Sequence, residues 1–442
     1  MKHVTLIFLP MLALAFGVDD WPRWRGPLNN GVARGDVPAE FGLEKNLAWK
    51  LDLPGRGFSS PVLWGDRIFL PTASPAAAEA PAPPPAEGGG AGNDGRRRGG
   101  GGGSGKGREH KFVLMAVDAR TGKVIWERVA KTATPHEGYH GRYGSFASNS
   151  PVTDGKHVLA FFGSRGLYCY DLDGKLIWEK QFTPMHMRME FGEGSAAVLH
   201  GNTVLLNFDQ ESGSFIVALD KNTGKELWRK ERNEASSWAP PFVVKAAGHD
   251  QVILPASAKV RSYDLHNGEV IWECGGLGTN VIPSPVTVDD RFVIVMSGHR
   301  EPNLLAIKLD SKGDVTGSDK VMWSNQRGNS YTPSPVLHDG KLYMLTDNGM
   351  LSCLDAASGR PNYTQQRLPN PSNYKASPVA VNGKLYLLSE NGDVLVLRLG
   401  EKFNVVSVNS FGTDHMFIAS PAVSGDSLYL RSIAALFCIR KR

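Results

Sequence analysis

Short apolar runs separated by glycine-containing turns recur along the whole chain. Each repeat opens on Ser-Pro-Val or a close variant and continues into an apolar strand. The repeats start at Ser60, Ser150, Ser195, Pro240, Ser284, Ser334, Ser377 and Ser420. The steps between these starts are 90, 45, 45, 44, 50, 43 and 43 residues. A strand-rich period in the forties is typical of β-propeller blades, so the pattern predicts an eight-bladed, all-β propeller.

The repeat that begins at Ser334 shows the order of strands within one blade. It reads SPVLHDGKLYMLTDNGMLSCLDAASG, with three apolar strands separated by Asp339-Gly340 and Asn348-Gly349. These dipeptides supply the positive φ that two-residue hairpins need. With a further strand after the last turn, the pattern predicts antiparallel blades of four strands.

The fourth strand of several repeats carries a tryptophan four residues after a turn glycine. These tryptophans are Trp126, Trp178, Trp228 and Trp272, and Trp49 occupies a similar strand near the amino terminus. An aspartate at the start of such a turn accepts backbone hydrogen bonds, and the indole offers a broad apolar face and one donor. We therefore predict that all five pack between neighbouring blades. The motif weakens in blades five, seven and eight, and Tyr363 replaces the tryptophan in blade six, which predicts less regular interfaces there.

The two ends of the chain complement each other. The strand around Trp49 precedes the first repeat, whereas the last repeat, from Ser420 to Arg442, has room for only three strands. We predict that the amino-terminal strand completes blade eight as its outer strand. Ring closure of this kind removes unpaired sheet edges.

The first residues, MKHVTLIFLPMLALAFG, have a short basic start and an apolar run too short for a membrane helix. This pattern predicts a signal peptide over residues 1–15 and a single exported propeller domain over 16–442, in the periplasm or outside the cell. No cysteine follows the apolar run, so no lipid anchor is expected, and no later stretch is long enough to predict a transmembrane segment. Cys169, Cys353 and Cys438 fall at one small-residue position in non-neighbouring blades, and Cys274 ends a fourth strand, which predicts four structural cysteines without disulfides.

Residues 73–111 form a Pro/Gly/Arg-rich insert between the second and third strands of blade one, which explains the step of 90 residues. Its composition predicts disorder, and its place predicts that it hangs over the channel mouth. The insert holds four acidic and six basic residues, so much of the formal charge of +5 is local and no basic face for nucleic acid is expected. We favour a neutral loop expansion, because loops accept length at little cost; the alternative is a mobile basic flap that contacts an acidic partner.

The repeat DxxTGKxxW, seen here as DARTGKVIW and DKNTGKELW, resembles that of pyrroloquinoline-quinone (PQQ) propellers and of the outer-membrane assembly propeller BamB. The opening DWPRWRGPLNNGVA resembles exported PQQ-binding-like propeller proteins. The resemblance covers nearly the whole mature chain. It implies the fold, and in the quinoprotein dehydrogenases it implies PQQ held with calcium over the channel, an aspartate base and a disulfide of adjacent cysteines. This sequence has no adjacent cysteines and lacks those enzymes' extra loops, so the enzymatic site is not carried over.

Other catalytic and metal signatures are absent from the sequence, including HExxH, paired CxxC and GxSxG. His136 and His140 have a spacing that suits a metal on a helix, but the glycines around them predict a loop. We therefore predict no metal site and no catalytic residue.

Propeller ligands gather where the loops that enter the innermost strands converge. Polar and aromatic residues in these loops make up the candidate binding mouth: Arg142, Tyr143, His186, Arg188, Glu190, Trp238, Asn280, Tyr331, Tyr374 and His415. We centre the mouth on Arg142, Arg188, Trp238, Tyr331 and Tyr374.

Two function classes remain. We favour a non-catalytic, monomeric scaffold that binds a protein or peptide partner, because the regular ring carries no catalytic constellation. The alternative is a PQQ-dependent alcohol or sugar oxidoreductase, or a degenerate relative that still holds the quinone.

Overall fold

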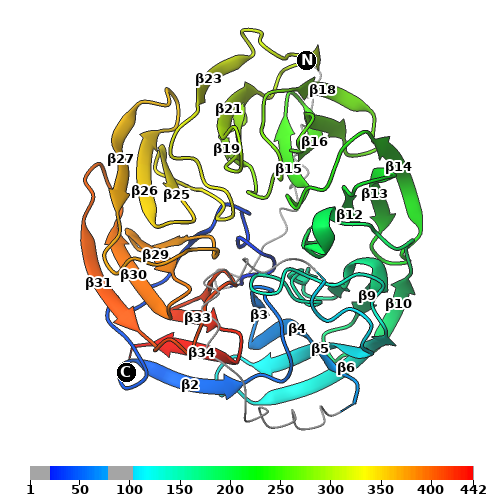
Figure 1. Ribbon diagram of the computed structural model, residues 1–442, viewed down its shortest axis with the longest axis vertical. Helices are drawn as coiled ribbons and strands as arrows, with labels where there is room; N and C mark the ends of the chain where they lie inside the picture. The colour runs from blue at the N-terminus through cyan, green and yellow to red at the C-terminus, as the bar shows by residue number, and fades with distance from the viewer. Residues whose placement is uncertain (1–19, 78–102, 442) are drawn as a thin grey trace, which may run out of the picture.

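The computed structural model describes residues 20–77 and 103–441. The predicted signal peptide and the middle of the insert lie outside these ranges. Eight sheets surround a common centre as the blades of a propeller (Figure 1). Each blade contains four antiparallel strands, and the last blade is completed from the amino terminus. Blades four and seven each carry one further short strand. The predicted fold is therefore confirmed.

The strands of blades one to four follow one another in chain order. Blade one contains β3 (Val62–Trp64), β4 (Arg67–Pro75), β5 (His110–Asp118) and β6 (Val124–Ala133). Blade two contains β7 (Val152–Thr153), β8 (Val158–Phe161), β9 (Leu167–Tyr170) and β10 (Leu176–Lys180). Blade three contains β11 (Val198–His200), β12 (Thr203–Phe208), β13 (Ser214–Asp220) and β14 (Glu226–Arg232). Blade four contains β15 (Phe242–Ala246), β16 (His249–Leu254), β17 (Val260–Asp264) and β18 (Val270–Cys274), extended by β22 (Gly313–Asp314).

The remaining blades follow the same order. Blade five contains β19 (Val286–Val288), β20 (Phe292–Ser297), β21 (Asn303–Lys308) and β23 (Val321–Asn325). Blade six contains β24 (Val336–His338), β25 (Lys341–Leu345), β26 (Met350–Asp355) and β27 (Pro361–Arg367). Blade seven contains β28 (Val379–Val381), β29 (Lys384–Leu388), β30 (Asp393–Arg398) and β31 (Val405–Ser410). Blade eight contains β32 (Ala422–Ser424), β33 (Ser427–Arg431), β34 (Ala435–Arg440) and β2 (Leu47–Asp52).

The ring closes as predicted between the two ends of the chain. Strand β2 pairs antiparallel with β34, with Trp49 opposite Cys438, and Figure 1 shows the two strands side by side. A second contact was not foreseen from the sequence. Strand β1 (Val32–Ala33) adds in parallel to β28, so the amino-terminal segment also covers the inner edge of blade seven.

Tryptophans in the fourth strands join neighbouring blades. The ring of Trp178 lies against Gly224 of the next blade, where an added Cβ would approach it to 2.6 Å, and its indole donates to the Lys221 carbonyl at 2.8 Å. Glycine is required at this position because its φ is +69° and the ring fills the space above it. The same glycine contact and carbonyl hydrogen bond are made by Trp49, Trp126 and Trp228.

Two further tryptophans differ from this pattern. Trp272 packs in a buried cluster with Val293 and Leu305 of the next blade, but its indole donates to the Gln251 side chain of its own blade at 3.2 Å. Trp323 of blade five packs on Gly359 of blade six, in the way the other docking tryptophans do. The sequence analysis did not include Trp323 because six residues, rather than four, separate it from Gly317.

The structure shortens the predicted disordered insert at both ends. Residues 73–75 continue β4, and residues 110–111 begin β5, with Ala73 opposite Phe112 and Pro75 opposite His110. Arg56 pairs with Ala73 on the other side, so the strand end has backbone partners on both edges. Ser104 forms a bridge to Tyr139, which anchors the returning end of the insert. Composition alone did not reveal these partners.

The four cysteines are buried and free, as predicted. Within the residues that the structure describes, no helix combines the length and apolar character needed to cross a bilayer. The only helical segments in those residues are the short 3-10 helices η1 (Gly163–Arg165) and η2 (Arg188–Glu190).

The serines that open the repeats form a hydrogen-bonded relay around the channel, which we call the serine ring. Five hydrogen bonds of 2.8 to 2.9 Å link six serines, each from the backbone N–H of one serine to the side-chain Oγ of the serine in the next blade. In order around the ring, the serines are Ser284, Ser334, Ser377, Ser420, Ser60 and Ser150. The repeated Ser-Pro-Val therefore has a structural cause at its serine as well as in its strand.

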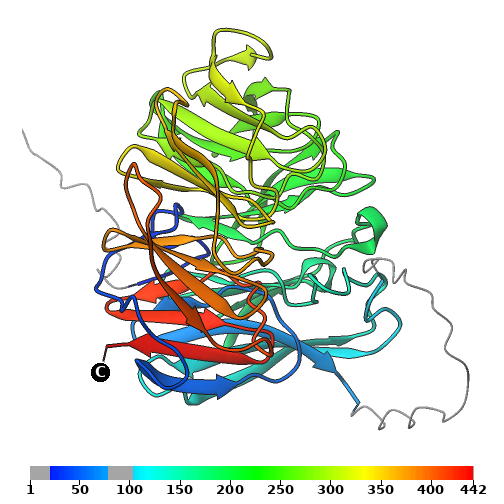
Figure 2. The same cartoon turned by 60° about the vertical axis from the view of Figure 1, so that its left-hand side comes forward.

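The amino-terminal segment, residues 20–31, closes one end of the channel. The Trp21 backbone pairs with Leu63 near the end of β3, and the Gly31 carbonyl accepts the N–H of Ala380. The guanidinium of Arg25 is buried and donates to the backbone carbonyls of Pro335 and Pro378. Burial lowers the pKa of Arg25 to about 9, so the group remains charged at neutral pH. In Figure 2 this segment, dark blue, lies on the left-hand side of the molecule.

Candidate functional site

A cavity of about 530 Å³ occupies the other end of the channel, and we call it the mouth cavity. Its lining includes Ser60, Ser150, Ser377 and Ser420 of the serine ring. Trp24 of the amino-terminal segment also lines it, and its indole donates to Ser420 Oγ at 3.2 Å. Because the amino-terminal segment enters from the opposite end, the channel is a blind pocket rather than an open tunnel.

Loops from several blades place aromatic side chains around the pocket. Trp238, in the loop that enters blade four, donates its indole N–H to the Gly192 carbonyl at 2.8 Å, so its ring is held in place. Tyr331, in the loop that enters blade six, stacks on His299 with ring centroids 5.0 Å apart. Tyr143 stacks on His140 at 4.9 Å. The pocket therefore offers oriented aromatic faces.

Cationic groups add to this lining. Arg188 is the first residue of η2, in which Met189 has a φ of 49°. Arg300 lies in the turn between β20 and β21. Neither arginine has a salt-bridge partner among residues 20–77 and 103–441. Lys375 also lines the pocket, but it pairs with Asp347. Burial, followed by the charges of Arg300 and Arg188, lowers the pKa of His299, so this ring is neutral at pH 7.

Among residues 20–77 and 103–441, the lining contains a single carboxylate, Glu193. Its Oε1 accepts hydrogen bonds from Arg165 at 2.6 Å and from the Ser164 hydroxyl at 2.8 Å, and its Oε2 accepts the Ser164 N–H. Calcium requires several oxygen ligands, usually with uncommitted carboxylates among them. The donor set of the mouth cavity therefore does not fit a calcium-bound quinone, and it favours an anionic or aromatic occupant.

Five of the ten residues predicted for the mouth line the cavity. They are Tyr143, Arg188, Trp238, Asn280 and Tyr331. These residues come from loops that enter several different blades, as the convergence argument required. Burial raises the pKa of Tyr331, and hydrogen bonding to Asn280 opposes that rise.

The other five predicted residues have different surroundings. Arg142 pairs with the buried carboxylate of Glu390 at 2.8 Å. His186 is 2.9 Å from Glu137, and Glu190 pairs with Lys106 from the returning end of the insert. His415 lies against Phe437 and its Nδ1 is 3.3 Å from the Ser432 hydroxyl. None of these four is part of the cavity lining.

Tyr374, which was predicted at the centre of the mouth, does not line the cavity. Its side chain is fully buried, and burial raises the pKa of its hydroxyl. The ring packs over Gly349, where an added Cβ would lie 2.8 Å from it. It therefore fills space between hairpins and does not face a ligand.

Trp24, His299 and Arg300 are among the lining residues that were not predicted from the sequence. Trp24 reaches the cavity because the amino-terminal segment threads into the channel, which no local pattern indicates. His299 and Arg300 lie in the turn between the second and third strands of blade five. The predicted mouth residues were taken only from loops that enter the innermost strands. The charged run HREPN between two apolar strands was the available signal in the sequence.

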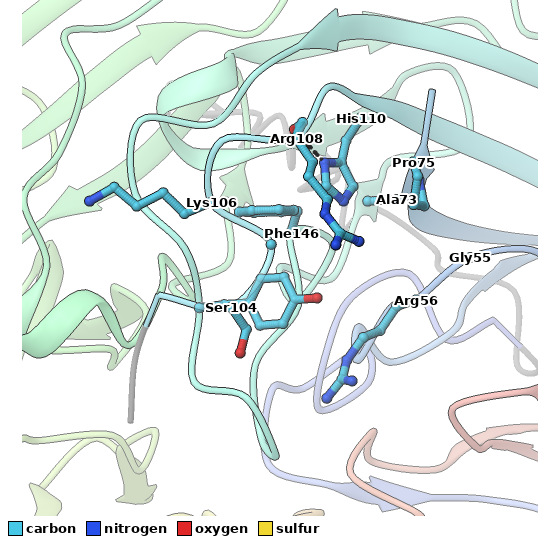
Figure 3. Close-up of a pocket in the computed structure, with 11 residues that line it drawn as sticks. Gly55, Arg56, Ala73, Pro75, Ser104, Lys106, Arg108, His110 and Phe146 are labelled. Carbon is cyan, nitrogen blue, oxygen red and sulfur yellow. Dashed lines mark hydrogen bonds between the residues drawn. The ribbon is translucent and has the colours of Figure 1, made fainter. Parts of the chain in front are cut away.

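A second cavity of about 520 Å³ lies beside the ordered ends of the insert. Figure 3 shows Arg56 and Arg108 reaching into it from different segments of the chain. Lys106 and His110 also line it, and none of the described residues in its lining carries a carboxylate. Arg56 donates to the carbonyls of Gly141 at 2.8 Å and Gly144 at 3.1 Å, so this arginine also orders the loop that enters blade two.

Comparisons with known proteins agree with the propeller fold. A family model for the outer membrane protein assembly factor BamB matches residues 110–365. BamB from Moraxella catarrhalis has a similar structure, with a TM-score of 0.58, 12% identity, and coverage of 90% of this chain and 97% of that one. None of the curated protein sequences compared with this chain matches it.

Two oxidoreductase structures are also similar. Quinohemoprotein alcohol dehydrogenase from Comamonas testosteroni has a TM-score of 0.61 and 11% identity, covering 96% of this chain and 81% of that one. A europium-containing methanol dehydrogenase has a TM-score of 0.64 and 10% identity, covering 95% of this chain and 90% of that one. Since the identities are so low, these likenesses establish the fold and not the activity.

Proposed function

The chain belongs to the family of the outer membrane protein assembly factor BamB, a family of PQQ-repeat propellers, and from this premise we propose that it is an exported, non-catalytic scaffold for a protein or peptide partner. The blind mouth cavity carries this proposal. Its lining combines oriented aromatic rings with two arginines that have no salt-bridge partner in the described residues. Such a pocket suits an anchoring side chain or a carboxylate at the end of a peptide.

The chemistry of the lining defines the occupant further. Arg188 and Arg300 supply positive charge, whereas Glu193, the only lining carboxylate in the described part of the chain, pairs with Arg165. Trp238 and Tyr331 supply flat apolar faces next to these cations. Tryptophan, tyrosine and arginine are the residue types that contribute most to binding energy at protein interfaces. We therefore expect a partner segment that presents an acidic group beside an aromatic or aliphatic side chain.

The test is a double variant, Arg188→Ala with Trp238→Ala, compared with the wild type in the native host. A photo-crosslinking residue at position 331 records which proteins enter the mouth. We expect the crosslinked partner to disappear in the double variant while the melting temperature stays within a few degrees. Arg291→Ala is the matched control, because this arginine is exposed on a hairpin and pairs with Asp289 of the same turn. Undiminished crosslinking in the double variant would refute the placement of the site.

The competing function is a PQQ-dependent oxidoreductase. The similarity to two alcohol dehydrogenases and the cationic lining favour it, whereas the engaged Glu193 counts against a calcium ligand set. A calorimetric titration of the mature protein with PQQ and calcium separates the two functions. The scaffold proposal predicts no heat and no rise in melting temperature. Binding with a stoichiometry near one would overturn it in favour of the enzyme.

A further inference from the structure

A cluster of metal-ligating side chains lies at the edge of the mouth, outside the cavity lining. His136 and Glu137 come from the loop that enters blade two, and His186 comes from the loop that enters blade three. One ligand atom from each of the three lies within 4.8 Å of the others. The two imidazole rings are perpendicular, with centroids 5.8 Å apart. The sequence paired His136 with His140 and predicted no metal, whereas the fold pairs His136 with a residue of another blade.

The backbone of residues 185–187 holds the cluster in place. His136 Nε2 is 2.6 Å from the Met185 carbonyl. A carbonyl only accepts, so Nε2 carries the proton and Nδ1 keeps a lone pair. Glu137 Oε2 accepts the Met187 N–H at 2.9 Å, and Glu137 Oε1 is 2.9 Å from His186 Nδ1. Hydrogen bonds of this kind, from a histidine to a carbonyl and from an amide to a carboxylate, are those that orient the ligands of metal sites.

Exposure differs among the three side chains in a useful way. The Glu137 side chain is 14% exposed, whereas that of His186 is 64% exposed. The carboxylate is therefore fixed at the base of the cluster, and the exposed imidazole leaves one side open to solvent. A metal ion has access from this side and has room for water as a further ligand.

We propose that His136, Glu137 and His186 bind a divalent first-row transition metal ion, of which Zn²⁺ is the representative. Two imidazoles with one carboxylate are a ligand set that zinc accepts, and imidazole favours such ions over calcium or magnesium. The bound ion would link the loops of blades two and three. Because Arg188 follows His186 by two residues, the bound ion would also fix the position of η2 at the mouth.

The experiment uses the mature chain without a histidine tag, with Zn²⁺ in calorimetry and Co²⁺ in visible absorption. We expect one ion per chain, cobalt bands in the visible range, and a rise in melting temperature with zinc. His136→Ala and His186→Ala should each weaken zinc binding roughly tenfold or more. Glu137→Gln keeps an acceptor for the Met187 N–H but removes the charge, so it should weaken binding without loss of the fold.

His249→Ala is the matched control, since this histidine is exposed on a hairpin of blade four. It should bind zinc as the wild type does. The proposal is overturned if the wild type gives neither heat nor cobalt bands, or if the three cluster variants bind zinc as tightly as the control. Melting temperatures of the metal-free variants show whether each is folded. This test is independent of the mouth cavity, so its result does not depend on the scaffold function.

Discussion

The inner wall of the propeller is built in two ways. The serines of six blades form the serine ring, in which five backbone N–H groups donate to the hydroxyl of the next blade's serine. In blades three and four the relay is interrupted. Ser195 Oγ instead donates to the Ala239 carbonyl at 3.3 Å, and the next repeat begins with Pro240, which has no N–H to give. As a result, the buried hydroxyl of Ser284 has no hydrogen-bond partner in the described residues.

The interruption coincides with the candidate sites. The loops that enter blades three and four provide Arg188 and Trp238 to the mouth cavity and His186 to the proposed metal cluster. Where a blade serves only the ring, its opening residues follow the repeat. The openings of blades three and four depart from the repeat, as is common at functional sites, whereas blades two, five and six keep it although their loops provide Tyr143, Asn280 and Tyr331.

The largest loss of stability should come from a change in the amino-terminal segment where it contacts the serine ring. Arg25 donates to the Pro335 and Pro378 carbonyls, which belong to two blades of the serine ring. Arg25→Ala leaves these buried acceptors unpaired, so we expect a loss of about 3 kcal/mol or more in the free energy of unfolding. Urea denaturation measures it. Arg34→Ala is the control, because this exposed arginine follows the segment by three residues, and it should change stability by less than about 0.5 kcal/mol. Equal losses in the two variants would contradict the stabilising role of the Arg25 hydrogen bonds.

The second effect concerns the blades between which the relay stops. Asp154 of blade two pairs with Lys221 of blade three at 2.8 Å. Burial on its own raises the pKa of Asp154, but hydrogen bonds from Lys221 and His157 outweigh it and lower the pKa to about 2. The folded-state pKa thus lies below the unfolded value of roughly 3.9, and the stabilisation exists above that value and is lost as pH falls toward 2.

Asp154→Asn should therefore cost about 2 kcal/mol at pH 7, and the difference from the wild type should shrink below about pH 4. Denaturation at a series of pH values measures this. Asp173→Asn is the control, because its pair with Arg67 joins blades one and two through an aspartate that is 81% exposed. Such a surface pair contributes less than about 1 kcal/mol. A difference that persists unchanged to the lowest pH would rule out the ion pair as its cause.

The fold was predictable because short-range sequence patterns that repeat determine its elements. Asp-Gly and Asn-Gly turns, Ser-Pro-Val openings and the Gly-to-Trp spacing each identify one element, and ring closure followed from counting strands. Trp323 escaped because a loop insertion changed its spacing, although its packing on Gly359 is regular.

The site was less predictable because its residues meet only through tertiary structure. Loop position alone brought five residues to the cavity, but it did not distinguish Tyr331, which faces the pocket, from the buried Tyr374. The contact of His136 with His186 joins two blades, and that of Trp24 with Ser420 spans almost the whole chain. No spacing rule reports contacts of this kind.

A third prediction compares two serines of the same repeat position. Ser377→Ala removes the acceptor of the buried Ser334 N–H, so we expect it to cost about 1–3 kcal/mol. Ser284→Ala removes a hydroxyl that is already without a partner, so it should cost less than about 0.5 kcal/mol or stabilise the protein slightly. Both serines are 2% exposed, which makes them matched positions for thermal or urea unfolding. Equal costs would show that the serine ring does not stabilise the blades.

The smallest effect should come from repairing the interruption. Pro240→Ala restores a backbone N–H at the position from which other blades donate to the next serine. The new hydrogen bond to Ser284 Oγ should contribute about 1 kcal/mol, offset by about 0.4–1 kcal/mol because the unfolded chain regains the freedom that proline removed. The net change in the free energy of unfolding is therefore near zero. The informative quantity is the coupling free energy between Pro240→Ala and Ser284→Ala. Ser284→Ala should cost about 1 kcal/mol in the Pro240→Ala background and almost nothing in the wild type. A double-mutant cycle without coupling would mean that proline is not what interrupts the serine ring.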